Sequence, residues 1–290
     1  MSSNLTASAK IQIKYSMLNK TPPACFLVPI HPPKFEYGIE FVKSYNQYYS
    51  DDHVYLVFSS EDDSEEFYKL ANGLRYKSIV HYKVKTPCPV TEKKYYGLQY
   101  IFNFTQFENV GVVDIDSVFT RTVDYPQLFE AYNQRGIFWG NNYDWSPVPI
   151  IASPLKFFPQ DDQKKLNTIL EDCRIYFWFN DLPVYNKKYF LDFIQYIDYN
   201  SRYKELVWFD FDYNIYAYYL LVKGVFTIKP FMIDPVTPLN NIFLEDQYII
   251  PKTVFSRLFA QAKPMWIKRD IEPEFMTGTF MNIHRDRKES

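Results

Sequence analysis

Residues 110–116 read VGVVDID, a short apolar run that ends in two aspartates separated by one residue. Successive side chains of an extended chain point to opposite faces, so Asp114 and Asp116 project to the same side. At the carboxyl end of a strand in a parallel α/β sheet, they stand where such sheets bind ligands. Carboxylate oxygens suit Mg²⁺ or Mn²⁺, and such an ion would hold a diphosphate. The alternative is a solvated strand end without function, because aspartates at this spacing are common by chance.

The chain before this run alternates between strand-like and helix-like patterns. Short apolar runs predict strands, and apolar residues at helical spacing predict helices. In chain order these are a strand at 24–30, a helix at 35–49, a strand at 54–58, a helix at 63–72, a strand at 78–82, a helix at 91–104 and a strand at 110–113. Such alternation indicates an α/β fold with a Rossmann-like, mostly parallel sheet that is joined by right-handed crossovers and flanked by helices.

Beyond Asp116 the alternation becomes less regular. The patterns predict helices at 125–135, 187–196, 213–222 and 252–263 and a strand at 225–228. An apolar run lies at 175–179, and a proline-rich stretch at 147–159. No linker, internal repeat or low-complexity segment divides the chain. We therefore predict a single domain over residues 1–290, with a nucleotide-binding half at about 20–120 and a substrate-binding half plus C-terminal tail at about 121–290.

Composition excludes several classes of protein. The 290 residues carry 32 Lys and Arg against 34 Asp and Glu, so the net charge of -2 argues against binding to nucleic acid or an anionic membrane. An apolar content of 47% is sufficient for a folded core. The aromatic content of 20% has two interpretations, which are drift of an AT-rich genome and surfaces that bind flat ligands such as sugars.

The three cysteines, Cys25, Cys88 and Cys173, are far apart in the sequence and form no disulfide or zinc pattern, which fits a reducing compartment. No window offers the roughly 18 consecutive apolar residues of a membrane-spanning helix, and the N-terminal residues do not resemble a signal peptide. We therefore expect a cytoplasmic protein without a transmembrane segment. The oligomeric state cannot be read from these patterns.

Four segments occur in an order that resembles a known family. They are FLVPI at 26–30, VYLVFS at 54–59, KKYYGL at 93–98 and VDIDS at 113–117. In this order they resemble the nucleotide-sugar half of GT-A glycosyltransferases, and in particular the small sugar transferases of bacterial surface-glycan loci and large DNA viruses. A further segment, DYNIYAYYLL at 212–221, is similar to a family segment with two acidic residues followed by spaced tyrosines, although Asn214 replaces the second acid.

The resemblance implies a metal-dependent hexosyl- or pentosyltransferase that moves a monosaccharide from a UDP-sugar to a glycan. The ion, Mn²⁺ or Mg²⁺, would bridge Asp116 and the diphosphate, and Asp114 would reach the ribose or a metal-bound water. Lys94 would approach the diphosphate or the sugar, with a solvated helix lysine as the alternative. The loops after the first two strands would contact the base, through Pro29, His31 and Ser59. The alternative for His31, equally open, is a loop histidine held by the neighbouring prolines.

Asp212 is a candidate general base because it opens a predicted helix, where a carboxylate is stabilised by the helix dipole. It could deprotonate an acceptor hydroxyl in a single displacement that inverts the anomeric carbon. Asp210 is the rival for this role. The alternative for Asp212 is a helix N-cap without catalytic function.

The C-terminal segment and two aromatic loops supply the remaining candidates. In several GT-A enzymes a late histidine is the third metal ligand and has a basic neighbour on the diphosphate, which by resemblance gives these roles to His284 and Arg285. An unstructured tail is the alternative. Indoles with amides and carboxylates suit sugar recognition. This chemistry makes six residues candidates for binding the glycan acceptor: Trp139, Asn141, Asp144, Trp178, Asn180 and Asp181.

Two other functions compete with glycosyl transfer. A sugar-nucleotide nucleotidyltransferase would share the parallel sheet and the carboxylate-bound ion, but it usually has a glycine-rich loop after the first strand. Here that loop reads PIHPP, and the chain has only eight glycines. A non-catalytic glycan-binding or structural protein would account for the aromatic loops but not for Asp114 and Asp116. Which sugar, acceptor and linkage are used cannot be read from the sequence.

Overall fold

The central strand of the fold is β1 (Ala24–Pro29), whose six residues are all buried. The computed structural model describes residues 21–81, 86–115, 117–119, 122–141, 148–172, 174–175, 183–230 and 280–282. In it, β1 lies between two parallel partners, β2 (Val54–Phe58) and β4 (Asn109–Val112). The complete order is β3-β2-β1-β4-β8, with β3 (Lys77–Val80) parallel to β2 and β8 (Val184–Asn186) antiparallel to β4.

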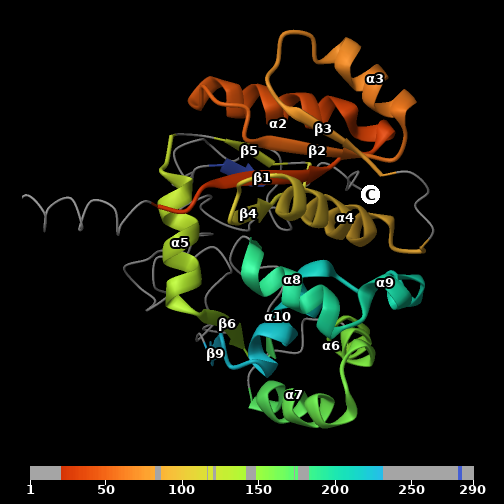
Figure 1. Ribbon diagram of the computed structural model, residues 1–290, viewed down its shortest axis with the longest axis vertical. Coiled ribbons are helices and arrows are strands. Elements are labelled where there is room, and N and C mark those ends of the chain that lie inside the picture. The colour runs from red at the N-terminus through yellow and green to blue at the C-terminus, as the bar shows by residue number, and fades with distance from the viewer. Residues whose placement is uncertain are drawn as a thin grey trace, which may run out of the picture.

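Helices cover both faces of this sheet (Figure 1). One face carries α2 (Phe35–Tyr48) and α3 (Glu61–Leu70), and α4 (Pro89–Phe104) lies across the other. Because the connections between the parallel strands are these helices, the alternation in the sequence corresponds to the observed order of elements. The predicted α/β class, with a mostly parallel sheet flanked by helices, is confirmed.

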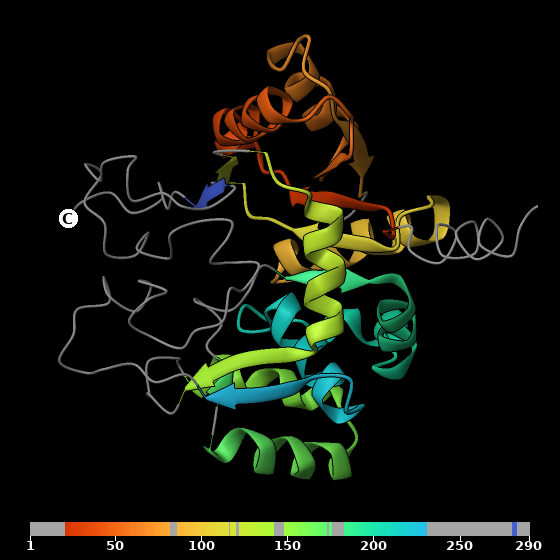
Figure 2. The same cartoon turned by 90° about the vertical axis from the view of Figure 1, so that its left-hand side faces the viewer.

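The second half of the chain adds two small sheets and a group of helices. Strand β5 (Ser117–Phe119) pairs antiparallel with β10 (Phe280–Asn282), and β6 (Ile137–Asn141) lies between β7 (Arg174–Ile175) and β9 (Thr227–Pro230). Figure 2 shows β6 and β9 side by side below the main sheet. The helical elements are η1 (Pro32–Lys34), α5 (Tyr125–Arg135), α6 (Val148–Ala152), η2 (Ser153–Phe157), α7 (Gln160–Asp172), α8 (Lys187–Tyr196), α9 (Tyr199–Arg202), η3 (Tyr203–Glu205) and α10 (Asp212–Val222).

The elements of the second half depart from the sequence prediction at several points. Helix α7 and strand β8 were not predicted, because α7 has a polar sequence and β8 is only three residues long. Of the apolar run at 175–179, the structure describes only Ile175, which belongs to β7. The strand expected at 225–228 begins at Thr227. The predicted helix at 252–263 lies outside the described residues.

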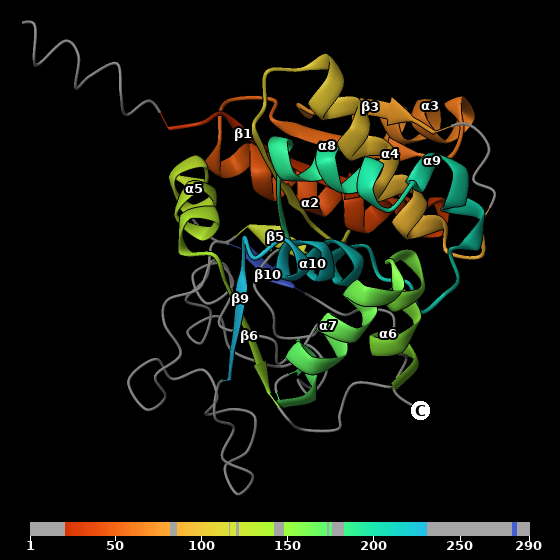
Figure 3. The same cartoon turned by 60° about the horizontal axis from the view of Figure 1, so that its bottom comes forward.

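Helix α10 is the most deeply buried helix of the second half, with ten of its eleven residues buried. It contacts α4, α7, α8 and η2, and Figure 3 shows it among these helices. A helix that is apolar on all sides is typical of a position inside the protein. Its burial fixes the position of Asp212, its first residue. None of the described helices has the length and apolarity needed to cross a membrane.

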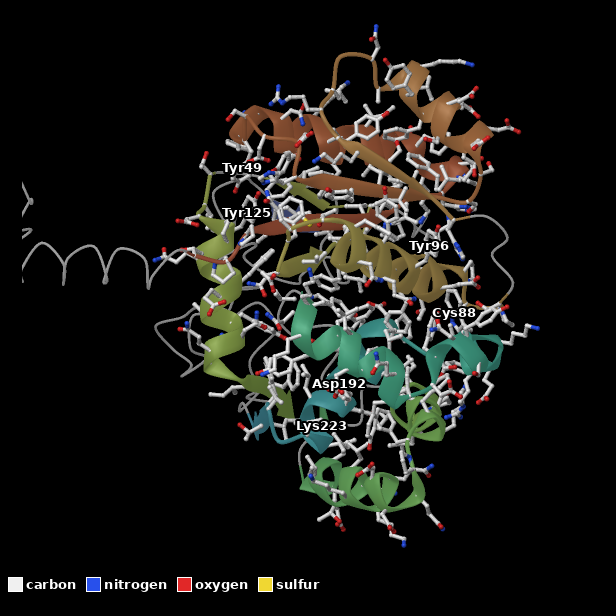
Figure 4. The ribbon with its side chains drawn as sticks, viewed as in Figure 1. Tyr49, Cys88, Tyr96, Tyr125, Asp192 and Lys223 are labelled. Carbon is white, nitrogen blue, oxygen red and sulfur yellow. The ribbon has the colours of Figure 1, made fainter. Side chains whose placement is uncertain are left out.

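Aromatic rings make up much of the described core. The ring of Phe26 on β1 lies within 6.0 Å of four other rings, those of Tyr45, Phe119, Tyr125 and Phe129. Tyr125 also meets Tyr49 edge to face at 5.3 Å, and both are labelled in Figure 4. Such edge-to-face contacts are favourable in protein interiors. Many of the aromatic side chains therefore stabilise the fold and need no ligand to explain them.

Gly97 allows α4 to approach the sheet closely. A Cβ atom at this position would lie 2.8 Å from Leu27 Cδ1 on β1 and 2.8 Å from Val57 Cγ2 on β2. We expect Gly97→Ala to lower the free energy of unfolding by about 1–3 kcal/mol, because the added methyl group overpacks the core. Urea denaturation measures this change.

The control is Asn103→Ala on the exposed face of the same helix, which should change stability by less than about 0.5 kcal/mol. Equal stabilities of Gly97→Ala and the wild type would contradict the close packing of α4 on β1 and β2.

Candidate active site at the carboxyl edge of the sheet

The carboxyl ends of the four parallel strands bring polar residues to one edge of the sheet. His31 follows β1, Ser59 follows β2, His81 follows β3 and Asp114 follows β4. This edge is where open α/β sheets bind ligands. Three residues that the sequence predicted for the site therefore lie at the carboxyl edge of the sheet: His31, Ser59 and Asp114.

Lys94 on the first half of α4 joins this edge to the second half of the chain. Its Nζ lies 3.2 Å from Asp114 Oδ1 and 3.1 Å from Asp212 Oδ1. The Lys94 side chain is 7% exposed, so the alternative of a solvated helix lysine is wrong. Burial lowers the pKa of Lys94, but the charges of Asp114 and Asp212 outweigh this effect and hold the pKa above its usual range. The ammonium is therefore charged at physiological pH.

Asp212 is buried, and both of its carboxylate oxygens accept hydrogen bonds. Lys94 Nζ donates to Oδ1, and the Tyr185 hydroxyl donates to Oδ2 at 2.6 Å. The Tyr95 hydroxyl donates to the backbone carbonyl of Asp212 at 2.7 Å. The N-cap of α10 is Phe211, so the prediction that Asp212 caps the helix is wrong. With 1% of its side chain exposed, Asp212 pairs with the ammonium of Lys94 inside the protein.

Asp210 is also buried, and its partners differ from those of Asp212. Ser153 Oγ donates to Oδ1 at 2.6 Å, and Lys156 Nζ and the backbone N–H of Val207 donate to Oδ2. The side chain is 0% exposed. Both candidate bases therefore have partners inside the protein, and the geometry favours a positioning role for each of them.

Lys93 is a second buried lysine at the sheet edge, and the sequence interpretation gave it no role. Its Nζ donates a hydrogen bond to the carbonyl of Ile30, directly after β1, at 2.6 Å. Burial lowers the pKa of Lys93 to about 8, and Asp63 opposes the shift. The signal in the sequence was the adjacent pair Lys93-Lys94 at the start of a helix that packs against an apolar sheet.

The loop after β1 is placed close to Lys93. His31 is exposed and occupies the N-cap position of η1 without making a side-chain capping bond. Partial burial and the charges of Lys93 and Lys34 lower the pKa of His31. Pro29 is buried as the last residue of β1. Lys93 and Lys34 therefore give this loop a positive charge that the nearby Asp63 carboxylate reduces, and such a charge suits an anionic ligand.

His81 forms a second polar cluster with residues of α4. Its Nε2 lies 2.9 Å from Oε1 of the buried Glu92, and its ring stacks on Tyr96, labelled in Figure 4, at 4.2 Å. These three residues line one end of a cavity of about 360 Å³. The same cavity is lined by Gln99, Tyr100, Asn103, Phe104, Tyr199, Asn200 and Tyr203. The sequence interpretation did not identify this cluster, because His81 and the α4 residues come from separate segments.

Several predicted site residues cannot be compared with the structure. Seven of them lie outside the described residues: Asp116, Asp144, Trp178, Asn180, Asp181, His284 and Arg285. Trp139 and Asn141 belong to β6, but only their backbone is described. Within the described part of the chain, no three His, Cys, Asp or Glu side chains form a metal-binding group. Asp114 is the one predicted ligand that is described, and its side chain is 56% exposed at the strand end.

Comparisons with known proteins give distant similarities only. No protein-family model matches the chain, and no curated protein matches it. Among solved structures, the WbbM bifunctional glycosyltransferase is similar with a TM-score of 0.42 and 11% identity over 79% of this chain and 49% of that chain. Core-mannan synthase A of Aspergillus fumigatus, in its Mn/GDP form, has a TM-score of 0.38 and 9% identity over 73% of each chain. The TarS protein of S. aureus has a TM-score of 0.35 and 14% identity over 68% of this chain and 33% of that chain.

This chain spans about half the length of WbbM and a third of TarS. At these identities and TM-scores, the similarities identify neither the family nor the activity of the chain.

The pair of Lys94 and Asp212 can be tested by a double-mutant cycle. Lys94→Met leaves the buried Asp212 carboxylate without its counter-charge, so we expect a loss of about 3–5 kcal/mol in the free energy of unfolding. Asp212→Asn should also destabilise, because Lys94 then keeps only the exposed Asp114 as a charged partner. The double variant should lose less than the sum of the two, as measured by urea denaturation. Additive losses would contradict a direct pair.

Lys93 gives a prediction for the pH dependence of stability. Its pKa is about 8 in the folded protein and near 10.5 in the unfolded chain, so between these values the unfolded chain binds the additional proton. Raising the pH then favours the folded state. We expect the stability of the wild type to rise relative to Lys93→Met between about pH 8 and pH 10, as measured by urea denaturation at each pH. A difference that stays constant with pH would show that Lys93 has an ordinary pKa.

Proposed function

We propose that this protein is a glycosyltransferase with a GT-A fold that moves a monosaccharide from a UDP-sugar to a glycan acceptor. One observation carries the proposal: the Lys94 ammonium is buried between Asp212 and the exposed Asp114 at the carboxyl edge of a parallel sheet. A fixed positive charge beside an exposed strand-end carboxylate suits a ligand that is itself anionic and metal-bound, such as a nucleoside diphosphate.

Lys94 would hold the diphosphate or the sugar of the donor. The geometry supports this role. Asp212 bonds the ammonium and Tyr185 bonds Asp212, so the ammonium is held in place without substrate. No reorganisation of the ammonium is then required when the donor binds. Asp212 is then a positioning residue that acts through Lys94. This role also explains why a carboxylate with 1% exposure begins a helix of aromatic and aliphatic residues.

A divalent ion, Mn²⁺ or Mg²⁺, is part of the proposal. Asp114 presents a partly exposed carboxylate at the end of β4, which is the donor type that both ions prefer. Asp114, Asp116 and His284 would hold the ion, with Arg285 close to the diphosphate. When bound, the ion neutralises the negative charge that develops on the leaving diphosphate.

The loops at the sheet edge would bind the rest of the donor. Pro29, His31 and Ser59 would contact the base, and the positive charge of the loop after β1 supports the binding of an anionic nucleotide there. The acceptor would contact the segments assigned to it from the sequence, which are Trp139, Asn141, Asp144, Trp178, Asn180 and Asp181.

A single displacement with inversion at the anomeric carbon also belongs to the proposal. Such a displacement needs a base that removes the proton of the acceptor hydroxyl. Asp210 and Asp212 are both buried and are both hydrogen-bonded to lysines. We therefore assign the base to neither of them.

The decisive experiment measures UDP binding and UDP release together. In a thermal-shift assay, UDP at about a hundred times its dissociation constant should stabilise the protein by about 2.7 kcal/mol when Mn²⁺ is present. Asp114→Asn and Asp116→Ala should lose most of this response and lower UDP release from UDP-sugars by roughly 10²-fold or more, because each removes a charged oxygen ligand.

The matched control is Asp52→Asn. Asp52 is a half-exposed aspartate that pairs with Lys77 at 3.2 Å, but it precedes β2 and therefore lies at the opposite edge of the sheet. This variant should behave as the wild type. No UDP response in the wild type would contradict the proposal, and release of pyrophosphate from UTP and a sugar phosphate would replace it with nucleotidyl transfer.

A further inference from the structure

A short turn before α10 presents three consecutive apolar side chains to solvent. Trp208 is 65% exposed, and Val207 and Phe209 are each 39% exposed. An exposed indole is unusual on a protein surface unless it serves recognition, because burying its large apolar area would stabilise the fold. None of the roles proposed above uses this turn.

The turn is held rigidly by bonds between its own residues. The N–H of Asp210 donates to the carbonyl of Val207 at 2.9 Å, and the N–H of Val207 donates to Asp210 Oδ2 at 2.7 Å. The N–H of Phe211 donates to the carbonyl of Phe209 at 3.1 Å. These bonds close the segment on both sides of Trp208. The indole therefore stands at the tip of an ordered turn.

Asp210 connects this turn to two other elements. Its carboxylate accepts bonds from Ser153 and Lys156 of η2, and its carbonyl accepts a bond from Thr91 Oγ1 at 2.9 Å. Thr91 lies on α4 three residues before Lys94, which is less than one helical turn. The tip of the turn is therefore held next to the part of α4 that carries the candidate donor site.

The anchor of this turn is a carboxylate that is completely buried and paired with Lys156. Burying a carboxylate and much of a lysine removes their hydration, and a buried ion pair is often no more stable than apolar residues would be. In return, the anchor removes the conformational freedom of the turn before any ligand arrives. A ligand that contacts an ordered side chain loses less entropy on binding than one that must order a loop.

We propose that Trp208 is a stacking platform for a pyranose ring of the glycan acceptor, with Val207 and Phe209 as its apolar sides and Asp210 as the residue that positions it. This inference rests on the proposed function, since the acceptor must lie beside the donor site. A pyranose ring has one face of C–H groups, which packs on an indole, while its hydroxyls remain hydrated or bonded at the rim.

A saccharide fits this surface better than a protein partner does. A stable protein interface covers about 800 Å² on each partner, usually with 20–30 residues, whereas the exposed apolar surface here consists of three consecutive residues. Lys204 and Glu205, which precede the turn, are exposed and charged. A sugar-binding subsite typically has a small apolar surface around one aromatic ring, with polar residues beside it.

The experiment uses the full chain with UDP and Mn²⁺ and a panel of methyl glycosides. The panel comprises the methyl β-glycosides of glucose, galactose, xylose and N-acetylglucosamine and the methyl α-glycoside of mannose, and saturation-transfer NMR measures binding. At least one of these probes should bind the wild type. Trp208→Ala should weaken that binding about tenfold, equivalent to about 1.4 kcal/mol, and Trp208→Phe should recover part of the loss.

The control variant is Tyr68→Ala, which removes a side chain that is 68% exposed on α3, away from the turn. It should bind the same probe as the wild type does. Melting temperatures of all variants show whether the fold is intact. Equal binding by wild type and Trp208→Ala, or no binding of any glycoside to the wild type, would overturn the inference.

A second measurement distinguishes a saccharide site from a membrane contact at Trp208. Sedimentation with vesicles of phosphatidylcholine and phosphatidylglycerol tests the membrane contact. The inference would be overturned if the wild type bound vesicles but no glycoside, and Trp208→Ala abolished the vesicle binding. The UDP thermal shift is read in parallel on the wild type. Glycoside binding that depends on Trp208 in a protein without a UDP response would contradict the glycosyltransferase proposal but retain the saccharide site.

Discussion

The buried ammonium of Lys94 is the interaction on which the site depends. It joins Asp114 at the end of β4 to Asp212 at the start of α10, and so connects the parallel sheet to the helices of the second half. Removing the charges of Lys94 and Asp212 from water is costly, and close ion pairs with further hydrogen bonds offset that cost. The Tyr185 and Tyr95 hydroxyls provide those bonds on the Asp212 side. A change in any one of these groups therefore affects the others.

Two neighbouring aspartates have separate structural tasks, although sequence alone made them rivals for one role. The Asp212 carboxylate accepts hydrogen bonds from Lys94 on α4 and Tyr185 on β8. The Asp210 carboxylate accepts hydrogen bonds from Ser153 and Lys156, which both belong to η2. The two side chains therefore fix the beginning of α10 from different directions, which leaves the turn containing Trp208 ordered and exposed. This arrangement gives a physical reason for two buried carboxylates in one short segment.

The aromatic residues also have two separate uses. In the core, the ring of Phe26 on β1 packs edge to face on Phe119 and Phe129, and these phenylalanine rings need no polar partner. Close to the sheet edge, the hydroxyl of the buried Tyr185 donates a bond to the buried Asp212 carboxylate. Burial and the nearby Asp212 charge raise the pKa of Tyr185, so its hydroxyl remains a donor. Composition alone could not distinguish these two uses.

The sequence by itself determined the parallel core of the fold, because apolar runs and helical spacing in residues 24–113 are local patterns. It also located Asp114 and Lys94, because a carboxylate after an apolar strand and a lysine at a helix start have positions that follow from secondary structure. It could not predict β8, whose three residues carry too little pattern, or the side chains that bind Asp210 and Asp212. The side chains that bind the two carboxylates lie 27 to 118 residues away in sequence. Only the tertiary structure brought them together, because long-range pairing is decided by how helices pack on the sheet and not by the residues next to each aspartate.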